Sequence, residues 1–165
     1  MRLYHSNIIM PRQSAGLLIY RYLQNELQFF LVHPGGPYFA KKNEGAWSIP
    51  KGEFTDEEDA LSAAQREFEE ETGQKISGSF IPLQTIKQKG GKLVHAWAIK
   101  GDVDADAVVS NTFQMEYPYK SGKWITVPEV DKAAWFGFDE ACIKLNSAQK
   151  ALIEELNNKL LHQDQ

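Results

Sequence analysis

The order of apolar and polar residues predicts two strands near the start of the chain. Residues 15–20 and 28–33 are nearly continuous apolar runs, typical of buried strands, and 24–26 form the turn between them. A long loop follows over 33–45, and residues 46–49 are predicted as a short strand that Pro50 ends. Loops of this length in compact domains usually carry function.

A helix is predicted over 56–72. Thr55 and Glu58 have the spacing of a capping box, in which each side chain bonds the other residue's backbone. Gly73 is the expected C-terminal stop. Leu61, Ala64 and Phe68 share one side of this helix, which is the side expected to face the core.

The second half alternates strands and helices. Residues 79–87 and 92–100 are predicted as a strand pair that turns at 90–91, and 93–99 is apolar on both faces, as in a central strand. Most of 101–119 is expected to be loop, 123–126 a short strand, and 138–145 and 147–161 two helices. The pattern predicts one α/β layered domain over residues 1–165.

Composition narrows the function. The net charge of -4 argues against general binding of nucleic acid or anionic membranes. Because Cys142 is the single cysteine, an internal disulfide and a cysteine-based zinc site are excluded. No apolar run approaches the roughly 18 residues of a membrane span, and the first residues form no signal peptide. A cytoplasmic location is therefore expected.

The helix ends in a run of carboxylates, Glu67, Glu69, Glu70 and Glu71. A helix C-terminus carries partial negative charge, and like charges three or four residues apart repel, so this run opposes folding. At about 100° per residue, Glu67, Glu70 and Glu71 fall on one arc and Glu69 points away. Three convergent carboxylates are hard ligands for Mg²⁺, Mn²⁺ or Ca²⁺. The alternative is an exposed acidic face.

The surrounding residues resemble the Nudix box, G-x5-E-x7-R-E-U-x-E-E-x-G-U, where U is a bulky apolar residue. Every other fixed position matches over the 23 residues from Gly52 to Gln74, and the one departure is Gln74, a polar residue at the last U position. The flanks 14–21 and 47–52 resemble the branch that contains dinucleoside polyphosphate and diphosphoinositol polyphosphate hydrolases.

The resemblance implies a Nudix-like α/β/α sandwich around a mixed sheet and metal-dependent hydrolysis of a pyrophosphate bond with Mg²⁺ or Mn²⁺. By position, the Gly52 carbonyl, Glu67, Glu70 and Glu71 would be metal ligands, Glu67 could instead be the base, and Arg66 and Glu58 would orient them. Many Nudix enzymes add a carboxylate from outside the box. Glu116 is the predicted one, with Asp102, Asp104 and Asp106 as competitors.

Several residues are candidates for substrate contact. Lys51, next to Gly52, and Lys41 and Lys42 in the long loop could contact phosphate, with a solvated loop lysine as the alternative. The remaining candidates are Tyr38, Trp47 and Tyr117 as stacking surfaces for a base and His95 as a polar contact, with core packing as the alternative.

The predicted function is hydrolysis of a nucleoside diphosphate-linked substrate, most of all a dinucleoside polyphosphate such as diadenosine tetraphosphate. The alternatives are a diphosphoinositol polyphosphate hydrolase and a non-catalytic module that senses a nucleotide. The expected partner is a small nucleotide or polyphosphate, with no nucleic acid and no membrane, and the sequence leaves the oligomeric state open.

Overall fold

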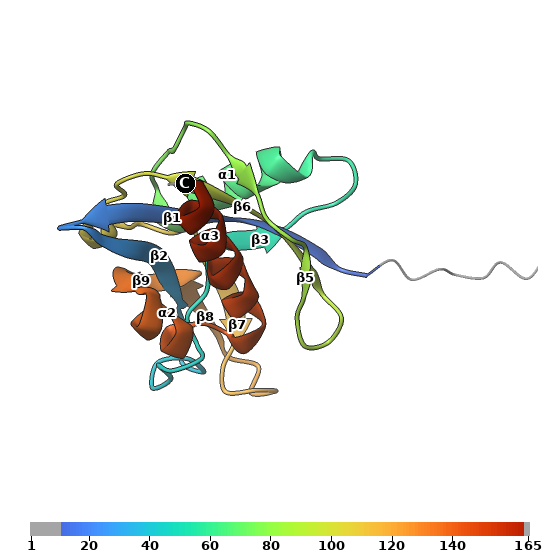
Figure 1. The fold of residues 1–165 in the computed structure, drawn as a ribbon. Helices are drawn as coiled ribbons and strands as arrows, with labels where there is room; N and C mark the ends of the chain where they lie inside the picture. Colours follow the sequence, from blue (N-terminus) through green and yellow to red (C-terminus); the bar gives the residue numbers. More distant parts are fainter. Residues whose placement is uncertain (1–10, 164–165) are drawn as a thin grey trace, which may run out of the picture.

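The computed structural model describes residues 11–163. They form a seven-stranded sheet, a separate two-stranded ribbon, and three α-helices (Figure 1). The sheet contains β1 (Gln13–Leu23), β2 (Glu26–Pro34), β3 (Lys51–Glu53), β4 (Ile81–Pro82), β5 (Ile86–Lys87), β6 (Leu93–Lys100) and β9 (Val130–Gly137). The ribbon is β7 (Thr112–Glu116) with β8 (Trp124–Pro128), and the helices are α1 (Ala60–Thr72), α2 (Phe138–Lys144) and α3 (Lys150–Gln163).

The sheet is mixed, in the order β4-β6-β1-β2-β9. Strands β1 and β6 are parallel, and every other pair of named strands in the sheet is antiparallel. Strand β3 pairs with the first half of β1, where Ala15 lies opposite Gly52. This pairing brings the segment around Gly52 against helix α1, on the face of the sheet that the helix covers. Gln24 and Asn25 close the β1–β2 hairpin with positive φ angles of 51° and 65°, which confirms the predicted turn.

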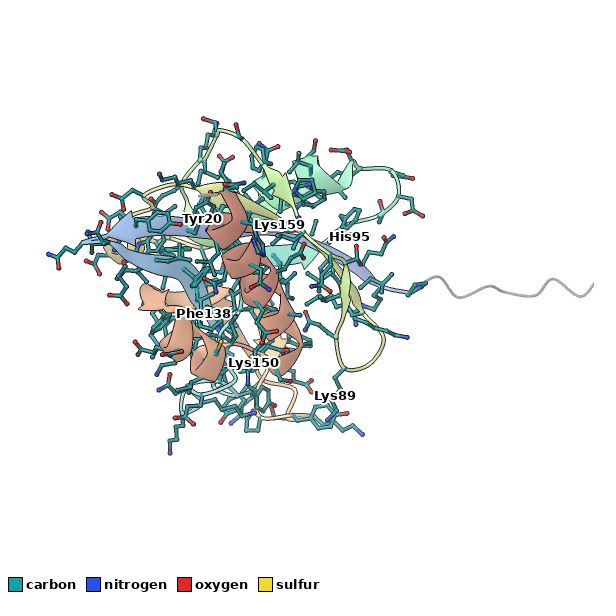
Figure 2. All side chains as sticks on the ribbon, in the orientation of Figure 1. Tyr20, Lys89, His95, Phe138, Lys150 and Lys159 are labelled. Carbon is teal, nitrogen blue, oxygen red and sulfur yellow. The ribbon has the colours of Figure 1, made fainter. Side chains whose placement is uncertain are left out.

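Helices cover both faces of the sheet. Helix α1 lies on one face, where Ala63, Ala64 and Phe68 pack against Leu17 and Phe30. Helices α2 and α3 lie on the other face (Figure 1). Phe138 at the start of α2 packs against Phe29 of the sheet, with ring centroids 6.4 Å apart (Figure 2). The predicted α/β/α sandwich is confirmed. In the part of the chain described, no helix is long and apolar enough to cross a membrane.

The start of α1 corrects the sequence prediction. The helix begins at Ala60, and the side chain of Asp59 accepts a hydrogen bond from the Ser62 amide, so Asp59 is the N-cap. Residues 55–58 form a turn in which the Glu58 amide bonds the Thr55 carbonyl. The predicted capping box does not form, because the Glu58 side chain is engaged by Arg66 instead.

Several short elements also differ from the prediction. Residues 46–49 are not a regular strand, since only isolated bridges join Ser48 to Val32 and Trp47 to Leu145. Strand β3 begins directly after Pro50. Strand β7 lies within 101–119, which was predicted to be mostly loop, and β9 was not predicted at all. The strand pair predicted over 79–87 and 92–100 is confirmed, with two short strands, β4 and β5, beside β6.

A buried glutamine fixes the segment that leads into β3. Gln149 has no exposed surface, and its Oε1 accepts a hydrogen bond from the Ile49 amide at 2.9 Å. Its Nε2 donates to the Ser48 hydroxyl at 3.0 Å. Since these residues form no strand ladder, the side chain satisfies a buried amide that would otherwise be unpaired.

Substitution of Gln149 should therefore cost stability. We expect Gln149→Ala to lower the free energy of unfolding by about 1–3 kcal/mol, the range for leaving a buried polar group unpaired. Gln114→Ala is the matched control, because Gln114 is an exposed glutamine of the ribbon that also makes a hydrogen bond. Equal losses for the two variants in urea denaturation would contradict this role.

Candidate active site

The last turns of α1 hold its acidic residues in place. The helix ends at Gly73, whose φ of 71° is left-handed and whose amide donates to the Glu69 carbonyl. No basic residue lies in the last turn to offset the helix dipole. The buried face of the helix holds Ala64 and Phe68, and the neighbouring Glu67 and Glu71 lie against strand β3.

Arg66 connects several of these carboxylates. Its Nε and Nη2 donate to the two Glu58 oxygens at 2.8 and 2.9 Å. Its Nη1 donates to Glu67 Oε1 at 2.8 Å and to Glu70 Oε2 at 3.1 Å. Arg66 thus forms ion pairs with Glu58 and Glu70 as well as with Glu67. The hydrogen bond to Glu58 is the largest cause that raises the pKa of Arg66.

Glu67 lies against the backbone of Gly52. The residue is 8% exposed, and burial raises the pKa of its carboxyl despite the neighbouring Arg66. A Cβ at position 52 would lie 1.9 Å from Glu67 Oε2, so a side chain there would displace the carboxylate. Glycine at position 52 is therefore required for this approach of strand β3 to helix α1.

Glu71 is the carboxylate with the most strongly shifted pKa in the cluster. Its Oε2 accepts a hydrogen bond from the Lys51 amide at 3.2 Å. Burial raises the pKa of Glu71 to about 8, and the charges of Glu67 and Glu129 raise it further against the opposing effect of Lys51. Burial, together with the nearby Lys92, also lowers the pKa of the Lys51 ammonium. Additional positive charge close to Glu71 would therefore favour its ionised form.

A fourth carboxylate, Glu129, comes from between β8 and β9. Its amide donates to the Asn111 carbonyl, and its own carbonyl accepts from the Gly35 amide at 3.1 Å. Burial raises the pKa of its carboxyl, and the Glu70 charge adds to this effect. Glu129, Glu71, Lys51 and Ser48 line a cleft of about 130 Å³ together with Val32, Pro34 and Val130.

Glu116 does not join these carboxylates. The Asn111 amide donates to the Glu70 carbonyl, so the start of the ribbon lies beside α1. Glu116 is the last residue of β7 and pairs with Trp124. It lies five residues beyond Asn111 along an extended strand, a separation of about 17 Å. The residue that the structure places beside the cluster is Glu129. Its only signal in the sequence is a carboxylate between Pro128 and Val130. That position becomes informative only when β9 is recognised as a strand.

The four carboxylates fit a divalent cation chemically. All donors are oxygens, and the buried Glu67 and the half-buried Glu71 have raised pKa values that a cation would lower. Within residues 11–163, no three acidic or histidine side chains are arranged around one point as ligands would be. Arg66 Nη1 stands between Glu67 and Glu70, so joint coordination by these two requires the guanidinium to give up a contact.

Two predicted contact residues lie elsewhere. Trp47 is 5% exposed and packs edge-on against His33 and Phe136, so it is a core residue with no free face for stacking on a base. His95 projects from β6 (Figure 2), where its ring nitrogens pair with Gln13 and Thr85, and β1 separates it from Gly52. Neither residue is brought to the carboxylates.

The competing aspartates belong to another surface. Asp102 pairs with Arg21, and the side chain of Asp104 accepts from the Asp106 amide. They lie in the loop after β6 and line a separate hollow beside Trp135. The backbone of Asp104 exchanges two hydrogen bonds with the Gln74 side chain just beyond α1, whereas the Asp102 and Asp104 carboxylates bond Arg21 and the Asp106 amide.

The long loop presents aromatic and basic side chains beside the ribbon. Tyr38 of the loop and Tyr117 after β7 pack edge-on with centroids 5.5 Å apart, and both remain partly exposed. Lys41 and Lys42 follow Tyr38 on exposed positions. The loop passes close to the ribbon at Gly35. This glycine approaches the Pro128 carbonyl so closely that the position cannot carry a side chain.

Known structures share this fold. A *Caenorhabditis elegans* diadenosine tetraphosphate (Ap4A) hydrolase in a binary complex aligns at 22% identity and a TM-score of 0.63, covering 92% of this chain and 98% of that one. The NUDIX domain of *Shewanella oneidensis* NrtR, complexed with ADP ribose, aligns at 17% identity and a TM-score of 0.64, covering 92% and 89%. A mutT/nudix family protein from *Listeria innocua* aligns at 19% identity and a TM-score of 0.56, covering 92% and 98%.

No curated protein gives a significant match to the chain. The model of the NUDIX domain family matches residues 10–156, which is most of the sequence and includes every residue of the acidic cluster. The matching box, the sandwich fold and the carboxylates at the end of α1 agree with this match. This chain therefore belongs to the NUDIX domain family and is a Nudix pyrophosphohydrolase that acts on nucleoside diphosphate derivatives.

Proposed function

We propose that this enzyme uses Mg²⁺ or Mn²⁺ to hydrolyse a dinucleoside polyphosphate such as diadenosine tetraphosphate. The observation that carries the metal dependence is the cleft in which the half-buried Glu71 lies with Glu129 and Lys51, where burial raises the pKa of Glu71 to about 8. Such a group is costly to ionise unless a cation is bound beside it. The structural likeness to the *C. elegans* Ap4A hydrolase supports the substrate class.

The residues that would hold the cation are Glu67, Glu70, Glu71, the Gly52 carbonyl and Glu129, with Glu129 in the role predicted for Glu116. A divalent cation, when bound, stabilises charge on the phosphate oxygens and makes a water molecule easier to deprotonate. Glu67 and Glu71 are the candidates for the base, because burial raises both pKa values. Arg66, fixed by Glu58, orients Glu67 and Glu70.

Two exposed segments support a substrate with more than one nucleoside. The loop 34–45 and the ribbon segment 112–128 each carry two lysines and one glutamate, in a chain whose net charge is -4. Tyr38 and Tyr117 meet between them. Lysine side chains attract phosphates, and tyrosine rings stack on bases, so this surface suits the part of the substrate beyond the cleaved bond. Lys51 in the cleft suits a phosphate next to that bond.

Two alternatives have less support. A diphosphoinositol polyphosphate is denser in phosphate and requires a broad basic pocket, whereas the cleft here is lined by two carboxylates and one lysine. A nucleotide-sensing role has a precedent in the NUDIX domain of NrtR, which was solved with ADP ribose. All box carboxylates are present in this chain, which favours catalysis over sensing.

A substrate panel tests the proposal. Purified protein with Mg²⁺ or Mn²⁺ should release phosphate-containing products from diadenosine tetraphosphate faster than from NDP-sugars, NADH, nucleoside triphosphates or diphosphoinositol phosphates. Faster turnover of another compound would overturn the substrate assignment, and no turnover of any compound with either metal would overturn the catalytic one.

Glu71→Gln separates catalysis from stability. We expect activity to fall by about 10²-fold or more, since a ligand or base is lost. Because the pKa of Glu71 is about 8 in the folded chain against an ordinary 4.5, the folded chain retains a proton between these pH values that the unfolded chain releases. The metal-free protein should therefore lose stability as the pH rises from about 5 to about 8, and Glu71→Gln should remove that loss.

Glu69→Gln is the matched control, because Glu69 is an exposed glutamate of the same helix. Its activity and its pH dependence of unfolding should equal those of the parent protein. The two readouts are initial rates and chemical denaturation at several pH values. A Glu71→Gln protein that is clearly less stable than the parent without metal would indicate a structural ion pair instead.

A further inference from the structure

Phe113 is an exposed aromatic residue on the face of the β7–β8 ribbon that also carries Glu129. It pairs with Val127 across the ribbon, and the Glu129 amide donates to the Asn111 carbonyl, which extends the same ladder. Because side chains alternate between the two faces of such a ladder, Asn111, Phe113 and Glu129 share one face. Phe113 and Glu129 are diagonal neighbours on it, about 7–8 Å apart.

The neighbouring part of this face is covered by the long loop. A Cβ on Gly36 would lie 3.6 Å from the Met115 side chain and 3.7 Å from that of Val127, so the loop packs on both residues. Val127 is 5% exposed, whereas its partner Phe113 is 41% exposed. The loop therefore leaves the Phe113 ring open, at the end of the face nearest Glu129.

The open ring also lies close to the end of α1. The Asn111 amide donates to the Glu70 carbonyl at 2.8 Å, and both residues line a hollow of about 390 Å³ together with Arg66. Phe113 follows Asn111 by two residues, which is about 7 Å along an extended strand. The ring is thus next to the carboxylates on two sides, those of α1 and that of Glu129, without being one of the cation ligands.

This placement fits the shape of a nucleotide, in which one ribose separates the base from the first phosphate. With the phosphates at the carboxylates, the base reaches the next open surface of the ribbon face. A phenyl ring is a surface on which any nucleobase can stack. We infer that Phe113 is a specificity-determining residue on which the base next to the carboxylate-bound phosphates stacks.

The inference rests on the proposed function, since it takes the phosphates to bind at the carboxylates, and it makes that function more specific. Phe113 would bind the nucleoside nearest the cleaved bond, and Tyr38 and Tyr117 the nucleoside beyond it. An uncharged ring gives little to a substrate that carries only phosphates on an inositol. The enzyme should therefore require a base at this end of its substrate.

Trp124 is the matched control. It is an aromatic residue of the same ribbon and is 64% exposed. It pairs with Glu116, three residues along β7 from Phe113, so the two rings lie on opposite faces. A general affinity of bases for exposed aromatic rings would involve Trp124 as much as Phe113, whereas a site beside the carboxylates involves Phe113 alone.

Two small ligands separate binding of the base from binding of the phosphate. AMP and ribose 5-phosphate carry the same phosphate and sugar, and only AMP carries a base. In NMR titrations of the whole protein with Mg²⁺, the parent should bind AMP about tenfold more tightly than ribose 5-phosphate, the scale of one base stacked on an aromatic ring. Phe113→Ala should weaken AMP binding about tenfold and keep the affinity for ribose 5-phosphate within twofold.

Two further variants and one spectroscopic signal complete the test. Phe113→Tyr keeps the ring, and Trp124→Ala keeps Phe113, so both should bind AMP within twofold of the parent. The ring protons of Phe113 should shift upfield when AMP binds, because a stacked base shields them. Ribose 5-phosphate should not cause this shift.

The outcomes distinguish this inference from the proposed function. Unchanged AMP binding in a folded Phe113→Ala protein, an equal loss for both ligands, or a parent that binds AMP no more tightly than ribose 5-phosphate overturns the role of Phe113, even with rapid turnover of diadenosine tetraphosphate. A loss in Phe113→Ala that is confined to AMP, without turnover of diadenosine tetraphosphate, supports the stacking and overturns the proposed substrate alone.

Discussion

The site depends on one guanidinium shared among several carboxylates. Arg66 binds Glu58 with two hydrogen bonds and also reaches Glu67 and Glu70, so these three acids have a cation in contact. Burial and neighbouring negative charges raise the pKa values of Glu71 and Glu129. Among the ion pairs of residues 11–163, none includes either carboxylate. The uneven distribution of positive charge is what makes the end of α1 suited to a divalent cation.

Other parts of the fold hold these carboxylates in position. The β1–β3 pairing sets Gly52 against Glu67, where any side chain would displace the carboxylate. Gln149 fixes the irregular segment before β3 from the opposite helical layer. The entry of β9 adds Glu129, and the packing of Phe68 against Phe30 sets how far α1 stands from the sheet. An acidic helix end that would repel itself in isolation is therefore held by contacts from three other segments.

The sequence predicted the parts of the molecule that follow from local periodicity. The buried runs of β1, β2 and β6 and the apolar face of α1 were predicted correctly. The convergence of Glu67, Glu70 and Glu71 on one cation stays a prediction. The start of α1 was predicted wrongly, because Glu58 could satisfy either a capping box or Arg66, and only tertiary contact decides between them. Trp47 was a candidate stacking surface with core packing as the alternative, and Glu129 was not predicted, because burial and strand pairing over about a hundred residues are not visible locally.

The most direct test of the metal site is anomalous diffraction from a crystal of the protein soaked in Mn²⁺. The account predicts a manganese peak within coordinating distance of carboxylate oxygens of Glu67, Glu70 or Glu71, with the Arg66 guanidinium withdrawn from at least one of its present partners. A peak confined to the aspartates at 102–106, or no peak at the end of α1 at a Mn²⁺ concentration that supports activity, would contradict it.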